Sequence, residues 1–77
     1  MQTHALSRNE IQAIQNDWVA ASNAVVEAEA EALDALLQYR RRKCDVTKLR
    51  MVYALEVRNA ANARMRALIE AIWANPL

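Results

Sequence analysis

The feature that most constrains this chain is the absence of residues that would interrupt a helix. Among its 77 residues there is no glycine, and the one proline, Pro76, stands next to the last residue. Alanine, which has the highest helix propensity because it loses no side-chain entropy, occurs sixteen times. The sequence therefore predicts an all-α fold.

Start and stop signals divide the chain into two helices. Ser7 and Glu10 have the spacing of a capping box, in which each side chain satisfies a backbone amide of the other residue. The cations at 40–43 are typical of a last helical turn, where they meet the negative end of the helix dipole. Asn75-Pro76 ends the second helix because the residue before a proline disfavours helical angles. We expect one domain with a flexible arm over 1–6, a helix over 7–43, a turn over 44–47, a helix over 48–74 and a tail over 75–77.

Apolar residues recur along the first helix at alternating spacings of three and four, which is the pattern of a coiled-coil seam. The best apolar face of the second helix drifts from this spacing. We expect the two faces to pack together as an antiparallel hairpin, with Asp45 or Thr47 capping the second helix after the turn. The first seam comprises Ile11, Ile14, Trp18, Ala21, Val25, Ala28, Ala32, Ala35 and Tyr39, and the second face Met51, Ala54, Val57, Ala61, Met65, Leu68 and Ile72.

A further apolar stripe runs beside the first seam, through Val19, Val26, Leu33 and Leu36. A helix with two apolar stripes is typical of a bundle of more than two helices. A chain below about 80 residues rarely builds a sufficient core on its own. We therefore expect a homodimer that forms a four-helix bundle. Its core and dimer seam would draw on Ile11, Ile14, Trp18, Val25, Leu33, Leu36, Met65, Leu68 and Ile72.

Charge is distributed unevenly between the two helices. Residues 1–38 carry one cation and six acidic residues, whereas residues 39–77 carry nine cations and three acidic residues. Opposite charges along the edges of two neighbouring helices help to specify antiparallel pairing. With a turn near residue 45, we expect Asp34 to lie near Arg58 and Glu27 near Arg64.

The chain has few residues suited to catalysis or to holding a cofactor. Its single histidine, His4, lies in the predicted arm, and a lone Cys44 with one histidine does not make a zinc site. Without glycine there is no phosphate-binding loop of the usual kind. We expect no enzymatic activity, no catalytic residue, no cofactor, no metal and no small-molecule substrate. Whether the Cys44 thiol is reactive stays open, because neighbouring cations and the helix end act on it in opposite directions.

The predicted location of the protein depends on two kinds of segment that the sequence lacks. The N-terminus lacks the apolar stretch of a signal peptide. No run approaches the roughly 18 apolar residues that would cross a bilayer. We expect a cytoplasmic protein with no membrane partner.

Two groups of residues are candidates for binding a partner. The first is the basic tip of the hairpin, where cations could contact phosphates and an aromatic ring could stack. The second lies on the polar side of the second helix, where isolated apolar residues suggest an interface. The candidates are Tyr39, Arg40, Arg41, Arg42, Lys43 and Lys48 at the tip, extended by Arg50, and Leu55 and Trp73 on the second helix.

In length, in its two helices and in the seam from Ile11 to Tyr39, the chain resembles the small plasmid-encoded RNA-binding regulators whose helical hairpins dimerise into four-helix bundles. In size it also resembles phage-encoded accessory proteins that inhibit host regulators or defence factors. The first likeness is architectural, so it assigns no RNA-contact residues here. Both likenesses imply a small regulator that acts by binding.

These observations together give the hypothesis of a non-enzymatic binding protein, of the kind that phages or mobile elements encode. It would dimerise and inhibit or modulate a target protein by occluding a functional surface. Two alternatives stay open. One is an RNA- or DNA-binding regulator that uses the basic tip, and the other is a structural co-chaperone of a secretion or assembly system.

Overall fold

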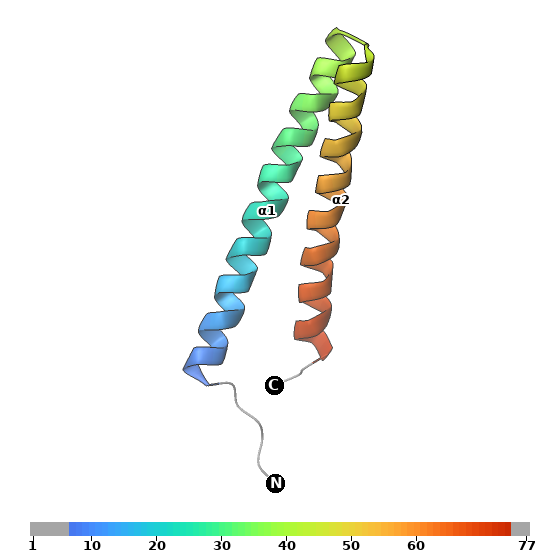
Figure 1. Ribbon diagram of the computed structural model, residues 1–77. Coiled ribbons are helices and arrows are strands. Elements are labelled where there is room, and N and C mark those ends of the chain that lie inside the picture. Colours follow the sequence, from blue (N-terminus) through green and yellow to red (C-terminus); the bar gives the residue numbers. More distant parts are fainter. Residues whose placement is uncertain (1–6, 75–77) are drawn as a thin grey trace.

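A computed structural model of the chain describes residues 7–74 and folds them into an antiparallel hairpin of two helices, with no strand in this range (Figure 1). Helix α1 spans Arg8–Arg41 and helix α2 spans Asp45–Ala74. The predicted all-α hairpin is confirmed. The predicted arm over 1–6, which includes His4, and the tail over 75–77 lie outside the described residues.

The predicted capping box forms at the start of α1. The backbone N–H of Glu10 donates to Ser7 Oγ and the backbone N–H of Ser7 donates to Glu10 Oε1, each over 3.1 Å. These two bonds satisfy amides that have no partner inside the helix. As a result Ser7 is the cap rather than the first helical residue, and α1 begins at Arg8.

The turn spans residues 42–44, one residue shorter and earlier in the chain than predicted: α1 ends two residues before its predicted end, and α2 begins three residues before its predicted start. Arg42 leaves the helix with extended backbone angles, φ −143° and ψ 94°, so no residue of the described range needs a positive φ. Thr47 closes the turn in place of a glycine. Its Oγ1 accepts from the Cys44 N–H over 3.2 Å and lies 2.6 Å from the Arg42 carbonyl oxygen, to which it donates.

Cys44 occupies the cap position that the sequence assigned to Asp45 or Thr47. It directly precedes α2, and its carbonyl oxygen accepts the first helical bond, from the Lys48 N–H over 3.0 Å. Thr47 contributes to the cap by accepting the N–H of Cys44. The prediction of Asp45 or Thr47 as the cap residue was therefore wrong, although the Thr47 side chain takes part in the cap.

Only alanines are fully buried in the described part of the hairpin. The predicted seam of α1 faces α2, and Met51 and Leu55 of α2 pack against its alanines near the turn. A methyl group buries little area, so this interior supplies little hydrophobic free energy for two long helices. The buried residues are Ala21, Ala28, Ala32, Ala35 and Ala54.

The packed face of α2 differs from the predicted one at its centre. Val57, predicted to face α1, is exposed, and Arg58 stands in its place half-buried. The observed face keeps a regular three-four spacing with an arginine in it. An apolar spacing pattern does not include arginine, because arginine is a charged residue. Its long aliphatic stem nevertheless covers apolar surface while its charged group reaches water. The face comprises Thr47, Met51, Ala54, Arg58, Ala61, Met65 and Leu68.

The two helices lie close together near the turn and separate toward their other ends (Figure 1). Alanines permit close approach, whereas larger seam residues hold helix axes farther apart. At this open end Trp18 and Ile72 remain 43% and 41% exposed although both belong to the predicted seam. Ile11 is also exposed, while Ile14, Val25, Met65 and Leu68 are half-buried.

Candidate interaction surfaces

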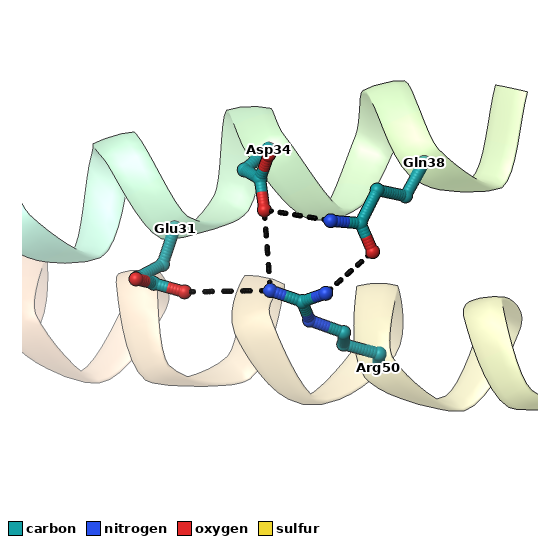
Figure 2. A network of polar contacts seen from close by, with 4 residues as sticks. All are labelled: Glu31, Asp34, Gln38 and Arg50. Carbon is teal, nitrogen blue, oxygen red and sulfur yellow. Dashed lines mark hydrogen bonds and ion pairs between the residues drawn. The ribbon is translucent and has the colours of Figure 1, made fainter. Parts of the chain in front are cut away.

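A network of polar contacts fixes the register of the two helices near the turn (Figure 2). The Arg50 side chain reaches from α2 to α1, where its Nη2 lies 3.1 Å from Asp34 Oδ2 and 3.9 Å from Glu31 Oε2. Its Nη1 donates to Gln38 Oε1, and Gln38 Nε2 in turn donates to Asp34 Oδ2 over 3.0 Å. These side chains are largely solvent-exposed, so each ion pair contributes only about 0–1 kcal/mol. The network therefore specifies alignment more than it stabilises.

This network corrects the predicted ion pairs. Asp34 pairs with Arg50 and not with Arg58, which lies about two helical turns farther from the tip. Within residues 7–74, Glu27 and Arg64 form no ion pair. The predicted pairs assumed a turn centred near residue 45, and the turn is centred about two residues earlier.

The hairpin tip, defined as residues 40–48, is strongly basic. Its five cations are all exposed, and Asp45 is its one carboxylate. Arg50, which the sequence predicts as an extension of this group, does not belong to it, because its guanidinium forms ion pairs with Glu31 and Asp34 in the polar network. Tyr39 is half-buried at the end of the seam, so it contributes only part of its ring to this surface.

An exposed apolar row on α2, next to these cations, was missed from the sequence. Val46, Leu49 and Tyr53 are 75%, 70% and 68% exposed. Their spacings of three and four place them on one side of α2. The predicted turn includes Val46, and neither Leu49 nor Tyr53 is among the predicted contact residues. The spacing itself was the signal that could have found this tip row.

The thiol of Cys44 is exposed within the tip. Thr47 Oγ1 lies 3.4 Å from Cys44 Sγ, and this hydrogen bond is the main cause that lowers the pKa of the Cys44 thiol. Arg42 lowers the same pKa further through its positive charge. Thiolate character is therefore raised at the turn, which bears on the reactivity of this side chain.

The flank of the hairpin opposite the Arg50 network is apolar. In an antiparallel pair, equivalent flanking positions of the two seams lie on the same side, as Arg50 and Gln38 do on the polar side. The stripe predicted on α1 thus shares a face with apolar residues of α2. We call this the apolar face, and it comprises Val19, Val26, Leu33 and Leu36 of α1 with Val52, Leu55, Ile69 and Trp73 of α2.

Most of the large residues on the apolar face are open to solvent. Leu33 is 59% exposed, and Trp73, a predicted partner-binding residue, is 80% exposed. Leu55, predicted alongside it, is half-buried because it packs against the alanine core. Leu33 and Leu36, assigned to a core or dimer seam, are not covered by α2.

A shallow hollow on the apolar face lies between the two helices. It is lined by Glu29, Leu33 and Leu36 of α1 and by Arg58 of α2. The Nε of Arg58 is buried without a hydrogen-bond partner, and its Nη2 donates to Asn59 Oδ1 over 3.3 Å. The arginine stem thus fills the space left by small seam residues beside it.

Neither helix of the described range is long and apolar enough to cross a membrane. Within the same range, no group of histidine, cysteine, aspartate or glutamate side chains could hold a metal ion. Comparison with protein-family models, curated proteins and solved structures finds no match for this chain. The geometry described above is therefore the basis for a functional proposal.

Proposed function

We propose that this protein is a non-enzymatic binding module that modulates a target protein by covering a functional surface on it. The hairpin tip and the tip row make the contact, and the apolar face joins two copies into a four-helix bundle. One observation carries the proposal: a dense group of exposed cations lies directly beside exposed apolar side chains. Such a surface fits a target that is acidic and partly apolar.

The positive charge of the tip determines the charge expected on the partner's surface. Five cations face one carboxylate within residues 40–48, whereas the rest of the chain has a net negative charge. Complementary charge of this kind steers encounter and suppresses partners of the wrong sign. The target surface is therefore acidic.

The tip row argues for a protein target over a nucleic acid. Val46 and Leu49 offer apolar contact that phosphate groups do not match. Exposed apolar residues grouped beside a charged rim are typical of protein interaction sites. Their burial on binding would supply affinity while the cations supply orientation.

The tip is also held in a fixed shape before binding. Thr47 links the two sides of the turn by contacts to Arg42 and Cys44, and Arg50 ties α2 to α1 just below it. A surface that is rigid in the free protein loses less conformational entropy when it docks. This favours occlusion by a preformed surface.

The test uses a defined probe, a labelled 20-residue synthetic helix with a leucine stripe flanked by glutamates, and measures fluorescence anisotropy. We expect the full chain to bind it, and the variants Leu49→Asp and Arg41→Ala to bind at least tenfold and about threefold more weakly. The matched controls are Ala63→Asp, on the same side of α2 about 21 Å away, and Arg64→Ala. Both controls should bind like the unaltered chain.

Two results would overturn this function. One is tight, salt-sensitive binding of a 20-nucleotide single-stranded RNA or a DNA duplex with no binding of the acidic helix, which would favour the nucleic-acid alternative. The other is binding of the acidic helix that the Leu49→Asp and Ala63→Asp variants weaken equally. That result would show an effect of general charge without a defined contact at the tip row.

A further inference from the structure

We infer that the apolar face receives a second copy of this chain in the antiparallel orientation, with the two-fold axis beside Val26 and the basic tips at opposite ends. The inference rests on the self-association in the proposed function and gives it a register. The occupant of the exposed face is a second copy of the chain, which contributes the same apolar face to the interface.

The apolar stripe of α1 is self-complementary when it runs antiparallel to itself. Val19, Val26 and Leu33 are spaced evenly by seven residues, and all three are exposed. A two-fold axis beside Val26 brings the two copies of Val26 together. It also lays Val19 of each copy beside Leu33 of the other, so apolar residues meet apolar residues at these three positions of the stripe.

The corresponding face of α2 has a matching symmetry. An axis between residues 60 and 61 places Val52 opposite Ile69 of the second copy and Asn59 opposite Asn62. It also brings Lys48 of one copy to the exposed Trp73 of the other, a pair suited to a cation–π contact. Leu55 then meets Arg66, whose stem can cover it.

The symmetry centres of the two helices fall at the same height in the hairpin. Near the turn, Ala32 and Ala35 pack with Ala54 and Met51. Extending this register by the heptad repeat brings Ala28 level with Arg58, and hence Val26 level with residue 60. One axis therefore satisfies both helices at once, as a closed dimer requires.

The opposite orientation, with both tips at one end, fits poorly. It would stack α1 of one copy on α2 of the other at equal heights and set Val26 against Asn59 and Val19 against Arg66. It would also bring together two tips that each carry five cations and one carboxylate. In the antiparallel dimer the tips stand about 50 Å apart, far beyond the screening length of about 8–10 Å.

The size of the apolar face suits a stable dimer. The 30-residue α2 is about 45 Å long, and two neighbouring helices are about 20 Å wide. The face thus covers roughly 800–900 Å², which matches the roughly 800 Å² that each partner contributes to a standard interface. Seven of the fifteen large apolar side chains that are exposed in residues 7–74 lie on this face.

Cysteine cross-linking tests the orientation, because Cys44 is the only cysteine and lies at the tip. After light scattering establishes the mass, mild oxidation is applied to the native chain and to Val26→Cys in a Cys44→Ser background. We expect a dimer mass, a disulfide-linked dimer for the Val26→Cys variant, and none for the native chain. Leu49→Cys in the same background, exposed but off the face, should not cross-link. Spin labels on the native Cys44 should lie about 50 Å apart.

The outcomes separate the orientation from the function. A dimer that cross-links through Cys44, with labels within about 20 Å of each other, overturns the antiparallel register but leaves self-association standing. A helical monomer at all concentrations overturns both this inference and the proposed four-helix bundle, while binding of the acidic probe helix is measured independently. As a second readout, Val26→Asp should give a folded monomer, whereas Leu49→Asp should remain dimeric.

Discussion

The half of the hairpin next to the turn and the half at its open end are built from different residues. The turn half, residues 28–58, contains four of the five buried alanines, the Arg50 network and the Thr47 contacts. The open half, residues 8–27 and 59–74, contains one buried residue, Ala21, and keeps Trp18 and Ile72 partly exposed. The seam between the helices is thus closed within one chain in the turn half, whereas in the open half the seam itself keeps apolar surface that one chain does not cover.

The two halves of the hairpin therefore have different structural roles. Alanines near the turn let two backbones approach closely, so alignment there depends on shape and a few polar contacts. Large side chains farther along hold the helices apart and leave area for another surface. Stability near the turn should therefore be sensitive to added volume, and stability at the open end to protein concentration.

The largest expected effect comes from adding volume to the turn half. Ala35 is 1% exposed, so Ala35→Leu has no space for its side chain and should lower the free energy of unfolding by about 2–3 kcal/mol. For a chain of this size that corresponds to a melting temperature lower by about 10–15 °C, measured by circular dichroism. Ala61→Leu, at a half-buried position of the open half, is the control and should change it by less than about 1 kcal/mol. Equal losses in both variants would remove the distinction between the halves.

Hydrogen exchange examines the same distinction without a substitution. In dilute protein, amides at the centres of both helices in the open half should exchange at least tenfold faster than those of the turn half, because fewer buried contacts oppose local opening. Raising the concentration should slow exchange more in the open half than in the turn half, because dimerisation covers part of both halves and the open half has fewer buried contacts of its own. Exchange that is uniform and independent of concentration would contradict this picture.

A smaller effect is expected from the polar network of the turn half. Arg50→Ala removes contacts to Glu31, Asp34 and Gln38, and it should cost about 1 kcal/mol because these contacts are largely solvent-exposed. Part of this loss should disappear in 1 M salt, where exposed ion pairs are screened. Arg64→Ala, which breaks no ion pair, should cost less than half as much in the same urea titration. A cost above about 3 kcal/mol would assign the network a structural role that its exposure does not support.

Much of this architecture was predictable from local sequence signals. The capping box of Ser7 and Glu10 and the seam of α1 depend on residues close together in the chain. The capping box appears as predicted, and so does the seam from Ala21 onward, whereas Ile11 and Trp18 at its start are exposed. The place of Arg58 in the packed face was not predictable from apolar spacing, because an arginine is buried only by virtue of the small residues opposite its stem. The pairing of Arg50 with Asp34 depended on a turn position that a shift of two residues alters.

The candidate surfaces were less predictable than the fold. The basic tip is visible in the sequence as consecutive cations, but its apolar neighbours Val46, Leu49 and Tyr53 could be recognised only once the packed side of α2 was fixed. For the same reason the sequence predicts Leu55 as a partner-binding residue, although it packs against the alanines. Which residues are exposed depends on which face of a helix packs against its neighbour. An alanine-rich helix has several faces of similar apolar character, so the packed face is hard to predict.

The smallest expected effect concerns the thiol within the turn. The Thr47 hydroxyl lowers the pKa of the Cys44 thiol, so Thr47→Val should raise that pKa and reduce the thiolate fraction near neutral pH. Alkylation by iodoacetamide at pH 7.5 should slow by a few-fold, and its pH profile should shift to higher pH, because the thiolate is the reactive form. Thr47→Ser keeps the hydroxyl and is the control, with a profile close to that of the unaltered chain. If Thr47→Val and Thr47→Ser react at the same rate, the hydroxyl does not tune the thiol, and the backbone N–H groups of Thr47 and Val46 and the charge of Arg42 are left as the groups that do.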